Sequence, residues 1–237
     1  MGIRRGSIST PIIADGLILN IDAANRASTI PSISTTTAYN TLDSNITATL
    51  YTDSIWTNST ISPSFNTDGT DGYISINNYT GFNGLNQFTI NFWVQATSNN
   101  AGLQFDSPLT LNNSNTLYIS FFQWFNSSTE FKFRLITDEG QTDLTINFGS
   151  SFFDSTWKNI TLYYDGSFMK VFQNGISIAS TAKTGTMSVP STADLYLMKS
   201  YGSNIMIGNV NGVQIYNRAL STNEVLHNYN ALKSRFE

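Results

Sequence analysis

Between Trp157 and Thr181 the sequence alternates apolar and polar residues on either side of two short turn signals. These signals are Asp165-Gly166 and Asn174-Gly175, and such pairs favour the positive φ angles of tight hairpin turns. The flanking runs have the two-residue period of half-buried strands. We therefore predict a three-stranded antiparallel meander, with its apolar faces formed by Ile160, Leu162 and Tyr164, then Met169 and Val171, then Ile176 and Ile178.

Further runs of aromatic and β-branched residues predict strands elsewhere in the chain. Phe88 to Ala96 is dense in such residues and is expected to be a central strand, whereas residues 22–51 are expected to form a long loop with one short strand near Ile46 to Tyr51. Many short strands separated by turn signals indicate an all-β sandwich. The other expected strands are Asp15–Ile21, one after a turn within Ser64–Asn77, a hairpin of Leu117–Phe125 and Phe131–Ile136 across Asn126–Thr129, Asp143–Phe148, Asp194–Met198, Asn204–Gly208 and Asn211–Asn217.

One helix is predicted near the end of the chain. Ser221 and Glu224 have the spacing of a capping box, in which each side chain bonds a free backbone N–H of the first turn. The helix is expected from about Thr222 to Lys233, and the only histidine, His227, is expected on its solvated side. The apolar stripe of the helix is formed by Val225, Leu226, Tyr229 and Leu232.

The N-terminal segment Met1 to Ala14 is predicted to be an extended arm, because Pro11 disfavours a helix. A disordered terminus is the alternative interpretation. Residues 15–237 show no linker or internal repeat and are expected to form one domain. The start of the chain lacks an apolar segment of signal-peptide length, so we expect synthesis in the cytoplasm without secretory export.

The composition excludes several classes of partner and chemistry. Only 12% of the residues are charged and the net charge is −4, with the 12 basic residues scattered along the chain. We therefore expect no nucleic-acid partner. No apolar run is long enough to span a bilayer, so no membrane partner is expected either. The chain has no cysteine, which excludes disulfides, thiol chemistry and zinc–thiolate sites.

The residues needed for hydrolytic catalysis are scarce. A Ser-His-Asp arrangement would require His227, which is expected at the surface. A glycosidase needs two carboxyl groups that face one sugar bond. The chain has four glutamates, none of which forms an i, i+2 carboxylate pair on a predicted strand. A distant pair of aspartates stays open, but no pattern points to one, and we expect a protein that is not an enzyme.

Two groups of residues are candidates for binding. Asp68 and Asp71 place two carboxylates in a turn before a strand, and hard oxygen ligands in an irregular loop suit calcium. An ordinary polar turn is the alternative. Trp124 and Phe122 belong to an aromatic cluster with Phe121 and Phe125, where alternation would point two rings outward for a glycan or a partner. Packing in the core or between subunits is the alternative there.

Four segments in order resemble motifs of one family. They are Phe65 to Ile74, Phe88 to Val94, Trp157 to Gly175, and Asn211 to Glu224 with its Ile-Tyr-Asn-Arg-Ala-Leu-Ser run. The chain resembles the laminin-G-like, concanavalin A-like jelly-roll family over most of residues 15–236. The resemblance implies two antiparallel sheets of roughly six or seven strands each, with Trp157 and Tyr164 in the core. The family includes glucanases, whose Glu-x-Asp catalytic strand is missing here, and calcium-dependent glycan and protein binders.

A narrower resemblance concerns the whole chain and its ending, which are similar to stand-alone jelly-roll proteins of tailed bacteriophages. It implies a non-enzymatic structural protein of the virion, most of all a capsid decoration protein that contacts the major capsid or tail proteins and binds surface polysaccharide. A tail-fibre or receptor-binding adhesin, lectin-like and calcium-dependent, is the alternative, and a glycoside hydrolase is the least favoured. A homo-oligomer stays open, because no heptad or symmetric pattern marks one.

Overall fold

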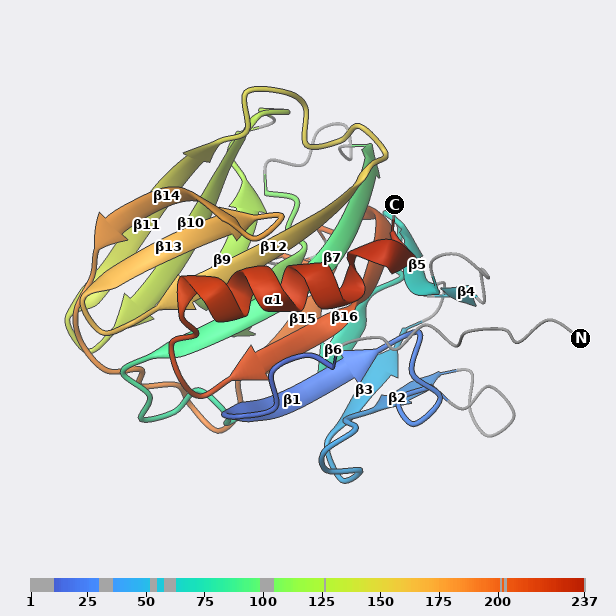
Figure 1. Cartoon of the computed structure of the whole chain (residues 1–237), viewed down its shortest axis with the longest axis horizontal. Helices are drawn as coiled ribbons and strands as arrows, with labels where there is room; N and C mark the ends of the chain where they lie inside the picture. Colours follow the sequence, from blue (N-terminus) through green and yellow to red (C-terminus); the bar gives the residue numbers. More distant parts are fainter. Residues whose placement is uncertain are drawn as a thin grey trace, which may run out of the picture.

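The computed structural model describes residues 11–29, 36–51, 55–57, 63–98, 105–125, 127–200, 202 and 204–236. They form two antiparallel β-sheets that pack face to face, with one α-helix near the end of the chain (Figure 1). This arrangement confirms the predicted all-β, two-sheet jelly-roll sandwich with one C-terminal helix. We call the sheet under the helix the front sheet and the other one the back sheet.

Each sheet contains eight strands in the described part of the chain, which is more than the six or seven that the resemblance implied. One strand of the front sheet, β1 (Leu17–Asp22), pairs with β16 (Ile207–Tyr216) at the side of the main strand order. The front sheet runs β14 (Ile176–Ala182), β13 (Phe168–Gln173), β12 (Trp157–Tyr164), β7 (Phe88–Ser98), β16 (Ile207–Tyr216), β5 (Ser64–Asp68) and β4 (Ile55–Thr57). The back sheet runs β11 (Gly140–Asn147), β10 (Glu130–Thr137), β9 (Thr116–Gln123), β8 (Leu109–Asn113), β15 (Asp194–Leu197), β6 (Ile74–Ile76), β3 (Thr47–Leu50) and β2 (Thr37–Tyr39).

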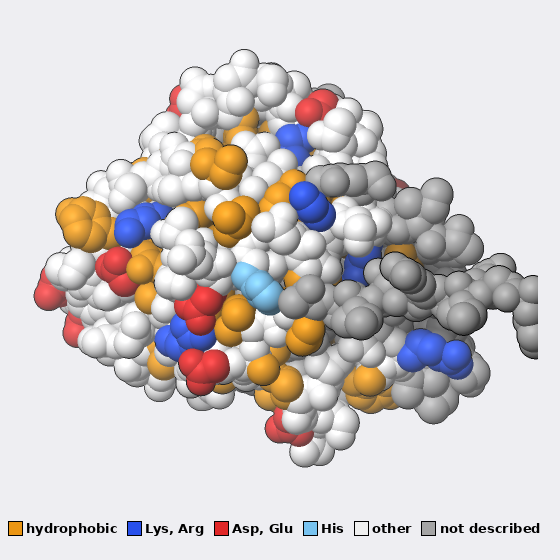
Figure 2. Space-filling view, viewed as in Figure 1, with side chains coloured by type: hydrophobic (Ala, Val, Ile, Leu, Met, Phe, Trp, Pro, Cys, Tyr) orange, Lys and Arg blue, Asp and Glu red, His pale blue; other side chains and the backbone are white. Residues whose placement is uncertain are grey.

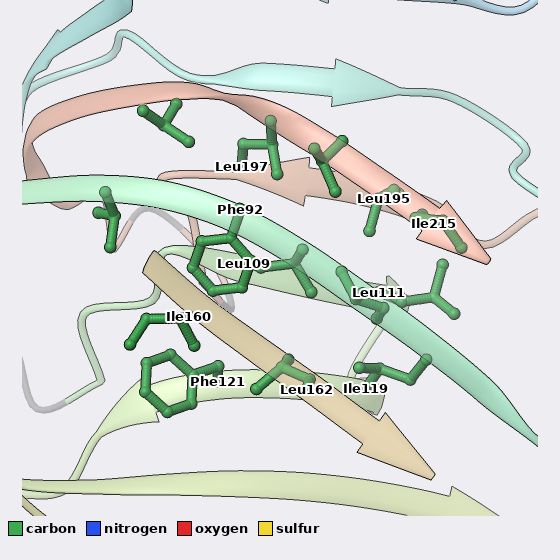
Figure 3. Close-up of a cluster of buried hydrophobic side chains, with 14 of the residues drawn as sticks. Phe92, Leu109, Leu111, Ile119, Phe121, Ile160, Leu162, Leu195, Leu197 and Ile215 are labelled. Atoms are coloured by element: carbon green, nitrogen blue, oxygen red, sulfur yellow. The ribbon is translucent and has the colours of Figure 1, made fainter. Parts of the chain in front are cut away.

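The core lies between the two sheets, where apolar side chains from both layers meet (Figure 3). Phe92 and Ile160 of the front sheet and Leu109 and Phe121 of the back sheet are all fully buried. Their burial follows from the two-residue period of each strand, which sends alternate side chains into the space between the sheets. Tyr164 is also fully buried and donates a 2.6 Å hydrogen bond to the carbonyl of Gly185.

The predicted meander is confirmed as β12, β13 and β14. Asn174 and Gly175 have φ angles of 52° and 79°, the positive pair that a tight primed turn requires. The other turn is also two residues long, but its central residues are Gly166 and Ser167, one position later than predicted, because the backbone N–H of Asp165 bonds to the carbonyl of Phe168. The carboxylate of Asp165 accepts hydrogen bonds from the backbone N–H groups of both Ser167 and Phe168. The register of the three strands therefore depends on one tight turn and one side-chain-bonded turn.

Three residues that were predicted on buried faces lie outside the core. Trp157 lies on the outer face of β12, because it is three residues from the inward-facing Ile160, and its half-buried ring packs against Phe236 at a centroid distance of 4.8 Å. Ile176 and Ile178 are 67% and 40% exposed. They belong to the edge strand β14, whose pairing with β13 is shifted by a bulge, so the sandwich does not enclose them.

Several short strands were missed by the sequence pattern. β2 lies in the predicted long loop, β5 precedes the turn at Asp68, and β8 occupies a segment that carried no strand prediction. The strands predicted at Asn204–Gly208 and Asn211–Asn217 are largely one long strand, β16, which runs past Gly212 without a turn. Gly212 permits this path because a Cβ there would lie 1.9 Å from the carbonyl oxygen of Ile21 on β1.

The helix α1 (Thr222–Leu232) begins with the predicted capping box of Ser221 and Glu224, and it continues into the short 3₁₀ turn η1 (Lys233–Arg235). It lies across the outer face of the front sheet (Figure 1). Trp93 on β7 is stacked against Tyr229 and Phe236 at centroid distances of 5.6 and 4.2 Å. Among the described residues, no helix is both long enough and apolar enough to cross a membrane.

The helix also holds the end of the predicted N-terminal arm. The backbone N–H of Ile13 donates a 2.8 Å hydrogen bond to Asn228, whose amide in turn donates to the hydroxyl of Tyr216. The ring of His227 lies 2.9 Å from the carbonyl of Pro11, so this histidine faces the arm rather than solvent alone (Figure 2). Residues 1–10 of the arm lie outside the described residues, and the predicted division into arm and domain stays a prediction.

Candidate functional site

The outer face of the back sheet carries a continuous row of mainly polar side chains. Strand pairing places one residue of each strand opposite its neighbour, so eight residues share this face across the whole sheet. Arg134 stands near one end of the row and forms a bidentate ion pair with Asp143 at 2.8 and 2.7 Å. In spatial order the row is Asp143, Arg134, Ser120, Thr110, Tyr196, Ser75, Thr49 and Thr37.

Three tyrosines gather around Tyr196 of this row, including Tyr196 itself. Tyr51 and Tyr73 are stacked with ring centroids 4.3 Å apart, and Tyr73 meets Tyr196 edge to face at 5.8 Å. The ammonium group of Lys199 lies 3.7 Å from the centroid of Tyr73 and 4.8 Å from that of Tyr196. The negative faces of aromatic rings attract cations, so this contact fixes the lysine above the tyrosines.

Asp194 is the carboxylate next to this group. Its Oδ2 accepts a 2.8 Å hydrogen bond from the hydroxyl of Tyr196, and its Oδ1 accepts a 2.8 Å bond from the backbone N–H of Asn78. Burial raises the pKa of Tyr196, and the hydrogen bond to Asp194 raises it further. Asp194 thus orients the tyrosine and is itself held at both oxygens.

Among the described residues, the ammonium of Lys199 has no such anionic partner at salt-bridge distance. Burial lowers the pKa of Lys199, and the charge of Asp194 opposes part of that effect. A partly buried cation without an ion pair favours an anionic group in its surroundings.

A small pocket opens beside these residues. Its volume is about 220 Å³, and we call it the lysine pocket. Ser200 in its wall is fully buried, and its hydroxyl has no hydrogen-bond partner among the described residues. A buried hydroxyl without a partner is costly, so a ligand atom that bonds it would gain stability. The wall also includes Asn112, Asn113, Asp194, Tyr196 and Lys199.

The predicted aromatic pair, Trp124 and Phe122, lies elsewhere on the same sheet. Phe122 is 1% exposed, so its ring presents no face to a ligand and instead supports Trp124 at a centroid distance of 6.2 Å. Trp124 is half-buried, and the ammonium of Lys132 lies 3.3 Å from its ring centroid. Phe125 beside it is 55% exposed, while Phe121 faces the core. Of the two predicted contact residues, only Trp124 is open to solvent.

The predicted calcium ligands lie at the end of β5. Asp68 uses its Oδ1 to accept a 2.8 Å hydrogen bond from the backbone N–H of Thr70, which is the geometry of a polar turn. Asp71 is exposed in the same turn. The described residues contain no group of three or more acidic or histidine side chains that could hold a metal ion. Calcium at Asp68 and Asp71 therefore stays a prediction.

The lysine pocket was missed because its residues are far apart in the sequence. The ring of Tyr73 lies on the outer face with Tyr51 and Tyr196, which no local pattern around Tyr73 indicates. One available signal was the run Leu195-Tyr196-Leu197, in which the tyrosine alternates with two buried leucines. Only the pairing of β6 with β15 brings Tyr73 and Tyr196 together.

Comparison with solved structures shows the same fold in carbohydrate-active and toxin proteins. Domain 4 of an extracellular arabinanase from Geobacillus stearothermophilus, solved with arabinotriose, has a TM-score of 0.56 and 17% identity over 73% of this chain and 79% of that chain. The binding domain of botulinum neurotoxin DC, solved with SialylT, has a TM-score of 0.68 and 13% identity over 92% of this chain. Trypanosoma rangeli sialidase has a TM-score of 0.65 and 12% identity over 96% of this chain.

The chain spans only 52% of that neurotoxin domain and 36% of the sialidase. At these identities the likeness concerns the fold alone. No curated protein matches the sequence significantly. The sequence does match the family model described as the concanavalin A-like lectin/glucanases superfamily over residues 68–226, from the end of β5 into α1. The chain therefore belongs to the concanavalin A-like lectin/glucanase superfamily.

Proposed function

We propose that this protein is a non-catalytic carbohydrate-binding protein whose lysine pocket holds an acidic sugar residue. The observation that carries the proposal is the ammonium of Lys199, which lies over Tyr73 and Tyr196 without an ion pair among the described residues. A sugar carboxylate or sulfate would supply the missing negative charge. The hydroxyl of Ser200 and the amides of Asn112 and Asn113 would bond the sugar hydroxyls.

Two comparisons support a carbohydrate ligand. The arabinanase domain was solved with arabinotriose, and the neurotoxin binding domain was solved with SialylT. Both share the fold of this chain at low identity, so they do not place a ligand here. They support the class of ligand, and the choice of an acidic sugar comes from Lys199 alone.

The arrangement of carboxylates supports a role without catalysis. On the outward face of the described back-sheet strands the acidic residues are Glu130, Asp143 and Asp194. Asp143 and Asp194 are four strand positions apart, which is about 19 Å and exceeds the roughly 5–9.5 Å between the carboxyl groups of a glycosidase. Asp143 pairs with Arg134 on β10, and Glu130 is four residues from Arg134 along that strand. This spacing separates Glu130 from Arg134 by about 13 Å.

A screen of acidic and neutral oligosaccharides tests the proposal. The wild-type protein should bind acidic sugars, and Lys199→Ala should weaken that binding by about 10- to 100-fold, the value of a hydrogen bond to a charged group. Lys170→Ala is the matched control, because Lys170 also lies over a tyrosine ring, that of Tyr163, on the front sheet. Unchanged binding by Lys199→Ala, or no acidic sugar bound at all, would overturn the proposal.

For the setting of this binding we propose the surface of a tailed-phage particle, with the protein decorating the capsid. The resemblance described above and the low proportion of charged residues, 12%, support it. The face in Figure 2 likewise shows mainly uncharged side chains. Apart from the charged contact at Lys199, contacts made by such a surface should be insensitive to salt.

Immunogold electron microscopy of purified particles tests this setting. Antibodies against the protein should label the capsid. Label on the tail would instead favour a receptor-binding adhesin, and particles without label would remove the virion proposal. Sugar binding is measured on the purified protein, so the outcome of the oligosaccharide screen does not depend on the outcome of the immunogold labelling.

A further inference from the structure

A larger cavity lies on the other side of Asp194 from the lysine pocket. Its volume is about 540 Å³, which falls within the range of small-molecule sites in proteins, about 300–1,000 Å³. Much of its wall is formed by residues of β3, of β6 and of the segment after β6. Ile18 of β1 and Asn217, which directly follows β16, complete the wall. We call it the asparagine cavity, since Asn45, Asn77, Asn78 and Asn217 line it.

The described wall of this cavity carries no charge. Its 13 residues include no aspartate, glutamate, lysine, arginine or histidine. In the described structure the side-chain amides of Asn78 and Asn217 make no hydrogen bond, so each has free donors and acceptors. Between these polar groups lie Ile18, Ile46, Ile76 and Leu85.

Tyr79 provides a second, independent observation. Its side chain is 5% exposed, and its hydroxyl has no hydrogen-bond partner among the described residues. The hydroxyl lies against Gly81, because a Cβ on that glycine would be 2.5 Å from it, and both residues line the cavity. Burial alone raises the pKa of Tyr79, so the group stays a neutral hydroxyl that can donate or accept.

The ligand that fits these features is an uncharged molecule with many hydroxyl groups and an apolar face. Amides and hydroxyls exchange hydrogen bonds with sugar hydroxyls without a charge on either side. The isoleucines and Leu85 suit the C–H face of a sugar ring. A charged ligand would lose its hydration and find no counter-charge in the described wall.

We infer that the asparagine cavity is a second sugar site, which takes a neutral sugar residue. It is separate from the lysine pocket, although Asp194 lies between them: its Oδ1 accepts from Asn78 in the cavity wall, and its Oδ2 accepts from Tyr196 in the pocket wall. This inference extends the proposed function to a second class of sugar, and it stands on the cavity alone if the lysine pocket binds nothing.

Saturation-transfer NMR with arabinotriose and a set of neutral methyl glycosides tests the inference. The wild-type protein should show saturable binding of at least one of these sugars. Thr47→Trp fills the cavity from β3 and should lower its affinity by about tenfold or more. Asn217→Leu removes one free amide from an exposed position and should weaken binding by a few-fold.

Thr145→Trp is the matched control, since Thr145 is exposed on β11 at the far edge of the same sheet. It should leave sugar binding and the thermal transition unchanged. Lys199→Ala separates the two sites, because it should weaken acidic sugars only. Absence of neutral-sugar binding would overturn the inference, and so would neutral binding that Lys199→Ala abolishes while Thr47→Trp and Asn217→Leu leave it intact.

Discussion

The hydroxyl of Tyr196 donates a 2.8 Å hydrogen bond to Asp194, two residues earlier on the same outward face of β15. The other oxygen of Asp194 accepts from the backbone of Asn78, which has a left-handed φ of 54°. One carboxylate thus fixes a ring in the wall of the lysine pocket and a backbone turn in the wall of the asparagine cavity. A substitution of Asp194 should therefore alter both the lysine pocket and the asparagine cavity.

Asp194→Asn should strengthen the binding of acidic sugars. The negative charge of Asp194 opposes an anionic ligand, and removing a like charge near the surface is worth on the order of 1 kcal/mol, or about fivefold in affinity. The asparagine can still accept from Asn78. Titration calorimetry at constant ionic strength measures the change, and Asp143→Asn is the control on the same face, with its carboxylate engaged by Arg134. Weaker binding by Asp194→Asn would show that the carboxylate itself contacts the sugar.

The affinity for acidic sugars should fall at high pH. Burial lowers the pKa of Lys199 from the usual 10.5 of a lysine, and only its charged form attracts an anion. Full binding is thus expected below that lowered pKa, and binding is lost as the pH rises through it. The loss should occur at a lower pH than for an exposed lysine. Lys199→Arg should bind without this loss, because arginine stays charged. Affinity that is constant for the wild-type protein up to the ordinary lysine pKa would contradict the proposed role.

Stability should fall in acid through Glu224. Arg218 forms a bidentate pair with this carboxylate at 3.0 and 2.6 Å, and together with the capping box it lowers the pKa of Glu224 to about 2 from 4.5. The stabilisation is fully present above pH 4.5 and is lost as the pH falls towards 2. The unfolding temperature of Glu224→Gln should be lower than that of the wild type at neutral pH, and the two temperatures should converge in acid. Glu130→Gln, on β10 of the back sheet, should show no such convergence.

Gly212→Ala should severely destabilise the fold. A Cβ at this position would lie 1.9 Å from the carbonyl oxygen of Ile21, and the backbone φ of 152° disfavours a side chain. We expect a loss of about 1–3 kcal/mol from overpacking and a similar amount from backbone strain. Gly84→Ala is the control with a positive φ and no atom within 4 Å. Chemical denaturation of both variants separates the cost of overpacking from the cost of backbone strain. Equal denaturation midpoints would show that the close approach to Ile21 is relieved at little cost.

The sequence predicted those parts of the fold that depend on neighbouring residues. The turn at Asn174 and Gly175 and the capping box of Ser221 and Glu224 are local, so their patterns were sufficient. Trp157 was misplaced, because an aromatic residue on a strand fits either the core or a face covered by another element. The covering ring belongs to Phe236, which is far away in the sequence.

The candidate site was not predictable in the same way. Tyr73, Tyr196 and Lys199 become neighbours only through the order of the strands in the back sheet. Trp124 could be chosen as a candidate because its aromatic neighbours are adjacent in the chain, but the burial of Phe122 depends on Phe105 and on Arg134 from β10. Local clusters are visible in a sequence, whereas sites formed across strands require the register.

The helix on the front sheet gives the molecule two unlike sides. The wall of the lysine pocket comes from β8, β15 and the chain beside them, whereas α1 lies on the outer face of the front sheet (Figure 1). The chain has no cysteine, so a single one introduced at the exposed Asn223, in the first turn of α1, would be a unique point for chemical attachment. Molecules coupled to a sensor chip through that residue would stand in one orientation, with the outer face of the back sheet turned towards the solution.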